Sequence, residues 1–214
     1  MRGVTEARSR PGGGNLMAQP LLPQILEALW SKELSRAYRV WAVLDGARDK
    51  RVYSAVVGCY TDNCCLYSGD LPSELKLAAP YLVSLDPEDR TTRYILRHAW
   101  GNSWGIFLRS TASMETLRRH MKGLLMVKDY KGRRLFFRFY DPRVLRVYLP
   151  TCWPAELEQV FGPVKAYLLE GAEEGTVVQY RVDERGLVEK VARLEAPPEI
   201  QGSDREGTDA VGAR

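Results

Sequence analysis

The chain has 214 residues, of which 45% are hydrophobic and 27% are charged, and its net charge is +4. This composition is typical of a folded domain and excludes wholesale disorder. No apolar run approaches the roughly 18 residues that a membrane-spanning helix needs, and the start of the chain lacks the apolar core of a secretory signal. We therefore expect a cytoplasmic protein with no membrane partner.

The two ends of the chain differ in composition from the middle. Residues 1–18 contain a proline and three consecutive glycines at 11–14, which predicts a flexible tail, and Met17 is an alternative start. Residues 195–214 carry five acids and two arginines, which predicts a disordered acidic tail. We expect residues 19–194 to form the folded domain.

Apolar spacing and turn residues predict the elements of this domain. A helix over 23–34 is followed by a strand over 38–44, a helix over 49–57, a strand over 66–67, a helical turn over 73–79, a strand over 81–85, a helix over 91–100 and a strand over 104–108. A helix capped by Ser113 then precedes a hairpin of 125–130 and 135–140, helices beginning near Pro142 and Pro154, and strands over 164–169, 176–182 and 187–191. This order predicts an α/β (mixed α+β) fold: a mixed sheet flanked by helices, with a smaller helical subregion and terminal strands.

The four cysteines do not have the pattern of a disulfide framework or a zinc site. Cys64 and Cys65 are adjacent and cannot readily bridge, and the spacing from Cys59 to Cys64 does not match common zinc motifs. We expect reduced thiols, no metal and no cofactor.

Residues 101–105, Gly-Asn-Ser-Trp-Gly, match the G-x-S-x-G pattern of a hydrolase nucleophile elbow. That elbow follows a strand and begins a helix, whereas here the predicted helix comes first and the strand second. A serine hydrolase built on Ser103 is therefore an alternative, and a glycine-bracketed structural turn is favoured.

Residues 109–146 hold eleven Lys and Arg against three acids, which gives this segment a net charge of +8. A basic segment of this kind suggests a nucleic-acid-binding protein as a second alternative. We favour the other explanation, in which these cations lie on solvated faces and in internal ion pairs.

Arg138 is the most informative charged residue of that segment. If 135–140 is a strand, its period of two places Phe136, Arg138 and Tyr140 on one face. A buried arginine there needs a carboxylate, so we predict an ion pair of Arg138 with Asp141 or Asp45. A ligand-clamping role for Arg138 is the alternative. Asp45, at a strand end, is expected to form a turn more readily than to act as a general acid or base.

An ordered series of short motifs carries a resemblance to a known family. The motifs are VLDGAR (43–48), APYLV (79–83), WGIFL (104–108), RRH (118–120), FRFYDPRVL (137–145), LPTC (149–152) and FGPV (161–164). Together they resemble the effector-adaptor chaperones of bacterial type VI secretion, known as Tap or TEC proteins, over residues 38–164.

The resemblance implies a non-enzymatic cytoplasmic adaptor that binds a toxic effector and helps to load it onto the VgrG spike protein. We do not expect nucleic acid to be its partner, and no catalytic residues are carried over. The motifs supply the structural or partner-binding candidates Asp45, Trp104, Arg138, Tyr140, Asp141 and Arg143. The residues after Val164 are less similar to the family, and we expect them to contribute to effector specificity.

Overall fold

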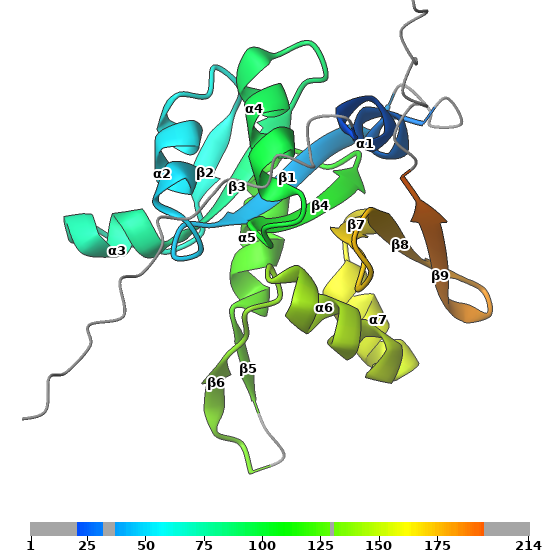
Figure 1. Ribbon diagram of the computed structural model, residues 1–214. Helices are drawn as coiled ribbons and strands as arrows, with labels where there is room; N and C mark the ends of the chain where they lie inside the picture. Colours follow the sequence, from blue (N-terminus) through cyan, green and yellow to red (C-terminus); the bar gives the residue numbers. More distant parts are fainter. Residues whose placement is uncertain (1–20, 32–36, 129–130, 195–214) are drawn as a thin grey trace, which may run out of the picture.

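The computed structural model describes residues 21–31, 37–128 and 131–194 (Figure 1). Their centre is a seven-stranded sheet in the order β2-β3-β1-β4-β7-β8-β9, and a separate two-stranded hairpin, β5-β6, extends away from the body. The predicted tails over 1–18 and 195–214 lie outside the described residues.

The elements alternate along most of the chain. The strands are β1 (Arg39–Asp45), β2 (Asn63–Cys65), β3 (Pro80–Leu85), β4 (Gly105–Ser110), β5 (Met126–Lys128), β6 (Arg134–Phe136), β7 (Val164–Glu170), β8 (Thr176–Asp183) and β9 (Gly186–Arg193). The helices are α1 (Leu22–Leu29), α2 (Lys50–Val57), α3 (Ser73–Ala78), α4 (Arg90–Ala99), α5 (Met114–Leu124), α6 (Pro142–Tyr148) and α7 (Pro154–Phe161), and the short 3-10 helix η2 spans Leu149–Thr151.

Every strand pair among the described residues is antiparallel, and the α+β class is confirmed. The sheet was expected to be mixed, and that detail is wrong. Since β3 and β4 both run antiparallel to β1, they are parallel to each other and joined through α4. This connection crosses over β1, which lies between β3 and β4 in the sheet.

Side-chain caps fix where several helices begin. The carboxylate of Asp49 accepts from the Arg51 N–H, that of Asp89 from the Thr92 N–H, and the Ser113 hydroxyl from the Thr116 N–H. Each cap satisfies one of the backbone donors left free in a first helical turn. The predicted helix starts at residues 49 and 113 follow from this chemistry.

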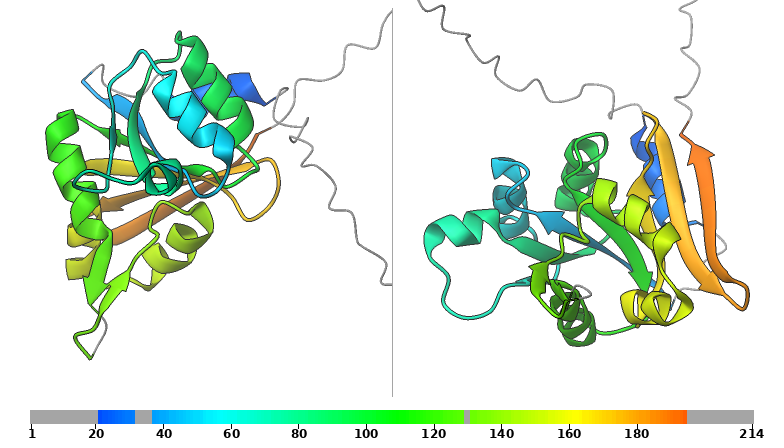
Figure 2. Two further views of the ribbon diagram at one scale, coloured as in Figure 1. Left: turned by 90° about the vertical axis from the view of Figure 1, so that its left-hand side faces the viewer. Right: turned by 90° about the horizontal axis from the view of Figure 1, so that it is seen from below.

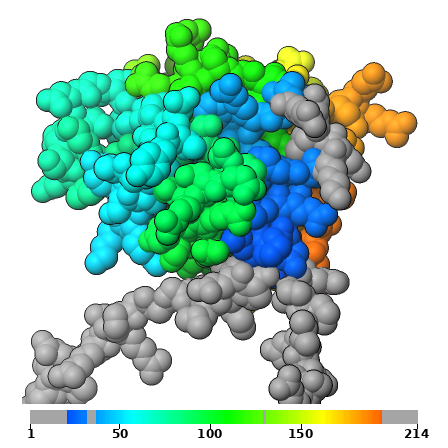
Figure 3. All heavy atoms as spheres, turned by 90° about the horizontal axis from the view of Figure 1, so that it is seen from above, coloured from blue at the N-terminus to red at the C-terminus, as the bar shows by residue number. Residues whose placement is uncertain are grey.

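Helices cover both faces of the sheet. Val40, Ala42 and Leu44 of β1 pack toward α1, α2 and α4, whereas Trp41 and Val43 pack toward α5, α6 and α7. Figure 2 shows the sheet between these two layers, and Figure 3 shows α1, α2 and α4 side by side on one face. Because alternate residues point to opposite faces and both faces are covered, the central strands are continuously apolar over 40–44 and 105–108.

Three predicted bounds are wrong. The helix expected over 23–34 ends at Leu29, with residues 32–36 outside the described residues. The strand expected at 66–67 lies at Asn63–Cys65, where pairing with β3 defines it. The strand expected over 135–140 ends at Phe136, because the chain then turns into α6, where the Asp141 N–H donates to the Arg138 carbonyl.

The half-buried ring of His120 makes stability depend on pH. Burial between α5 and α7 lowers the pKa of His120, although a hydrogen bond from Nε2 to the Val160 carbonyl, 3.0 Å long, opposes the shift. The unfolded chain takes up a proton near pH 6.5, before the folded chain does, so stability should fall as the pH drops below about 6.5.

Melting temperatures measured from pH 8 to pH 5 test this expectation. The wild type should lose stability below about pH 6.5, and His120→Gln should flatten that part of the profile. His98→Gln removes the other histidine of the chain and should leave the decline in place. An unchanged profile in His120→Gln would contradict the assignment.

Candidate functional site

Polar residues gather at one end of the sheet because neighbouring strands alternate in direction. β1 ends at Asp45 where β4 begins, and the Asp45 N–H donates to the Trp104 carbonyl at 2.7 Å. β7 runs antiparallel to β4 and ends at Glu170, at this same end. We call this end of the sheet the charged edge, formed by Asp45, Trp104, Glu170 and the residues that contact them.

Asp45 and Arg138 form an ion pair at the charged edge. The Asp45 side chain is 2% exposed and that of Arg138 is 45% exposed. The other carboxylate oxygen of Asp45 accepts from the Ala47 N–H at 3.1 Å, which fixes the turn after β1. The ion pair predicted from the sequence is therefore present, although Arg138 lies in a turn and not on the expected strand.

Asp141 and Arg143 form a second pair beside the first. The Asp141 carboxylate, 5% exposed, caps α6 through the Arg143 N–H and accepts from Nε and Nη2 of the same arginine at 2.9 and 2.6 Å. Burial alone would raise the pKa of Asp141, but the contacts with Arg143 hold it below its usual value. The carboxylate is therefore charged at neutral pH, and a planar guanidinium is held in two-point contact.

Trp104 lies under a third pair, that of Asp49 and Arg51. The Arg51 guanidinium lies 5.2 Å from the centre of the Trp104 ring and donates to Asp49. The hydrogen bond from Arg51 is the largest influence on Asp49, and it lowers the pKa of this carboxyl. The Trp104 ring also stacks on His98 with 6.0 Å between centroids.

Ser103 bonds to a carboxylate that the sequence analysis did not single out. Its hydroxyl donates to Glu170 Oε1 at 2.5 Å, and the Gly101 N–H donates to Glu170 Oε2 at 2.6 Å. Both histidines form hydrogen bonds elsewhere: His98 Nδ1 lies 2.8 Å from the Tyr94 carbonyl oxygen, and His120 Nε2 lies 3.0 Å from that of Val160. Ser103 also follows a helix and precedes a strand, so the geometry favours the structural turn. A polar residue directly after the apolar run of β7 is the signal that could have identified Glu170.

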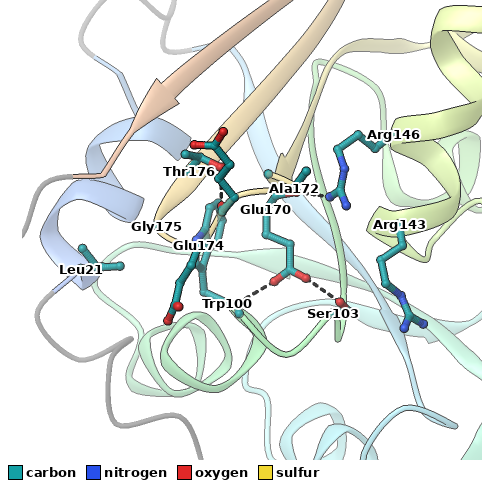
Figure 4. Close-up of a pocket in the computed structure, with 13 residues that line it drawn as sticks. Leu21, Trp100, Ser103, Arg143, Arg146, Glu170, Ala172, Glu174, Gly175 and Thr176 are labelled. Carbon is teal, nitrogen blue, oxygen red and sulfur yellow. Dashed lines mark hydrogen bonds between the residues drawn. The ribbon is translucent and has the colours of Figure 1, made fainter.

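A pocket of about 390 Å³ opens beside this hydrogen-bonded turn (Figure 4). Arg143 and Arg146 of α6 line one side, Glu170 and Ser103 lie next to them, and Trp100 and Thr176 contribute further wall. Nη1 of Arg146 donates to the Glu170 carbonyl at 2.7 Å, which ties α6 to the end of β7. The pocket therefore offers both guanidinium and carboxylate groups to a polar partner.

Of the six candidate residues predicted from the sequence, four are buried and two are half exposed. Asp45, Trp104, Tyr140 and Asp141 are buried, and burial raises the pKa of the Tyr140 hydroxyl well above its usual range. Arg138 and Arg143 are half exposed and are held by the buried aspartates. The two guanidinium groups are therefore accessible, and the buried carboxylates of Asp45 and Asp141 position them.

Several cations of residues 109–146 have partners within the fold. Arg109 is buried against α1, Arg118 donates to the Cys65 carbonyl, and Arg138 and Arg143 are paired with aspartates. These four side chains therefore agree with the explanation by internal contacts better than with a phosphate-binding surface.

The cysteines, the possible metal ligands and the helix lengths can also be compared with the sequence analysis. The four cysteines are half-buried free thiols, and burial raises the pKa of Cys59 to about 11. Within the described ranges, no group of three or more His, Cys, Asp or Glu side chains is placed to hold a metal ion. None of the helices there has the length and apolar character needed to cross a membrane.

The pair of Asp45 and Arg138 should be measurable as a coupling energy. Asp45→Asn keeps an acceptor for the Ala47 N–H but removes the charge, and should lower stability by about 1–2 kcal/mol. Urea unfolding of Asp45→Asn, Arg138→Met and the double variant should give a coupling of about 1 kcal/mol. Strictly additive losses would contradict a direct contribution from the pair.

Most residues of the charged edge lie in a part of the chain that matches a known protein family. A family model described as a domain of unknown function, DUF4123, matches residues 40–159, more than half of the chain. No curated protein matches the chain, and no solved structure does. The match includes all six candidate residues and ends within α7, before β7, β8 and β9.

Proposed function

Because the chain belongs to the DUF4123 family, known as the type VI secretion effector-adaptor (Tap/TEC) chaperones, we propose that it binds an effector in the cytoplasm and helps to load it onto the VgrG spike protein. The observation that carries this proposal is the family match over residues 40–159. In this role the protein performs no catalytic step, and residues 19–194 form the adaptor domain.

The geometry of the charged edge supports a binding role. Arg138 and Arg143 are presented by buried aspartates, so little side-chain freedom remains for a partner to remove. Arginine is enriched at protein–protein interfaces because its planar group forms several directed hydrogen bonds. We propose that this edge contacts a partner protein through these two side chains.

Co-expression with candidate effectors and VgrG proteins from the same genome tests the proposal. Size-exclusion chromatography with light scattering should give a complex of defined mass with the effector. A spike protein added later should form a reversible contact, because the adaptor has to be released before or during assembly. A chain that runs alone in both mixtures would refute the proposal.

A further inference from the structure

The half of the sheet formed by β7, β8 and β9 carries a groove on its α1 side. The groove has a volume of about 620 Å³ and lies between α1 and the three strands. Figure 2 shows α1 beside β8 and β9, which form the margin of the molecule. The opposite face of these strands packs Tyr167, Val178 and Tyr180 into the core, so the groove is the uncovered face.

Strand register places the residues of the groove on one face. Val177 lies opposite Ala192, Gln179 opposite Lys190, and Arg181 opposite Val188, and all six line the groove. Buried Ala166 and Leu168 of β7 add to an apolar floor. Cations and apolar side chains therefore alternate along a shared surface.

The charges of the groove are unbalanced. It is lined by Arg109, Lys165, Arg181 and Lys190, against one acid, Glu27. Across the described parts of the chain, no carboxylate forms an ion pair with Lys165, Arg181 or Lys190. The groove thus gathers exposed positive charge that the described fold does not neutralise.

Arg109 keeps the groove preformed. Its guanidinium is buried and donates to the carbonyls of Ala28 and Leu29, at the C-terminal end of α1. Cations are favourable at this end of a helix, where backbone carbonyls lack partners. Burial lowers the pKa of Arg109, yet arginine keeps its charge at neutral pH. The arginine thereby holds α1 along the strands.

Of the residues that line the groove, all but Arg109 lie in parts of the chain that the family model does not match. The match ends at residue 159, whereas β7 begins at Val164. Among the described residues, β9 pairs with β8 on one side and is the last strand of the sheet, and the outer edge of such a strand can pair with another chain. A surface that recognises one particular partner is expected in such a region.

We propose that this groove binds an acidic segment of the effector, and that this contact sets which effector the adaptor accepts. The inference rests on the proposed function. Carboxylates of the segment would pair with Arg181, Lys190 and Lys165, while its apolar side chains would contact Val188 and Ala192, which lie accessible beside the buried floor. The apolar floor favours a polypeptide over nucleic acid, which offers mainly phosphates to such a surface. Complementary charge also discriminates against wrong partners.

Charge reversal in the full-length chain tests the groove. Arg181→Glu with Lys190→Glu should weaken binding of the co-expressed effector at least about tenfold, measured by calorimetry at moderate salt. The control pair, Arg90→Glu with Arg97→Glu, makes the same change of charge on exposed positions of α4 and should change affinity less than about twofold. Melting temperatures of both double variants establish that they fold.

The possible results distinguish a failure of the groove inference from a failure of the proposed function. If wild type binds the effector and the groove variant binds equally well, the groove inference fails while the adaptor role stands. Equal weakening by both pairs would also overturn it, as would nucleic acid that copurifies and is lost only in the groove variant. A tenfold gain in effector affinity on neutralising the acids of residues 195–214, absent when Arg181→Glu and Lys190→Glu are also present, would show that effector and tail compete for the groove and would support the inference. If wild type binds nothing, the proposed function itself fails.

Discussion

Gly105→Ala should destabilise the fold by at least about 3 kcal/mol, because β1 and β4 approach each other too closely for a side chain. A Cβ at this position would lie 2.1 Å from the Val43 carbonyl oxygen and 2.9 Å from the Leu44 Cα. These are backbone atoms of the central strand, so relief requires the two strands to separate. Thermal unfolding should show a melting temperature lower by about 6–12 °C.

Gly123→Ala is the matched control for this substitution. Gly123 lies within α5, and no atom lies within 4 Å of an added Cβ. Alanine costs less conformational entropy in a helix than glycine, so Gly123→Ala should raise stability by about 0.5–1 kcal/mol. The two substitutions are thus expected to act in opposite directions, and a similar loss in both would contradict the close-approach argument.

Trp41→Ala should cost about 3–5 kcal/mol, because it opens a large cavity on the central strand. Trp41 is fully buried in β1, with Ser84 and Leu108 as its neighbours on the adjacent strands. Chemical unfolding should show the loss as a lower midpoint with an unchanged slope.

Trp41→Phe isolates the polar part of the same side chain. Within the described residues the Trp41 indole nitrogen is buried without a hydrogen-bond partner, and such a group costs about 1–3 kcal/mol. Removing it offsets the smaller cavity that phenylalanine leaves, so the net change should stay within about 1.5 kcal/mol. A loss as large as that of Trp41→Ala would show that the indole N–H has a partner.

Local chemistry allowed several elements to be predicted from the sequence. Asp49, Ser113 and Asp141 each combine a short acceptor side chain with a following helical pattern, and each caps a helix. β2 was misplaced because Asn63–Cys65 has no strong strand composition, and only its pairing with β3 makes it a strand. Strand direction was missed as well, since apolar patterns are the same for parallel and antiparallel neighbours.

The candidate site was only partly predictable, because it also depends on contacts between distant parts of the chain. The pairing of Arg138 with Asp45 followed from the cost of leaving a cation without a partner, although the strand assumed for Arg138 is a turn. Glu170 and Arg51 join the charged edge through strand order and helix position, which depend on the complete fold. These residues are distant in the sequence, so no local sequence pattern predicts their contacts.

β4 lies within the region that the family model matches, whereas β7, to which it is hydrogen-bonded, lies outside that region. A recombinant fragment of residues 40–159 would leave β4 with an unpaired edge and expose Phe107 and Leu108 to water. Such an edge promotes intermolecular strand pairing, so this fragment should aggregate rather than fold. The unit that evolution can exchange is therefore longer than the shared sequence: any relative that keeps β4 must supply a strand of its own to complete the sheet.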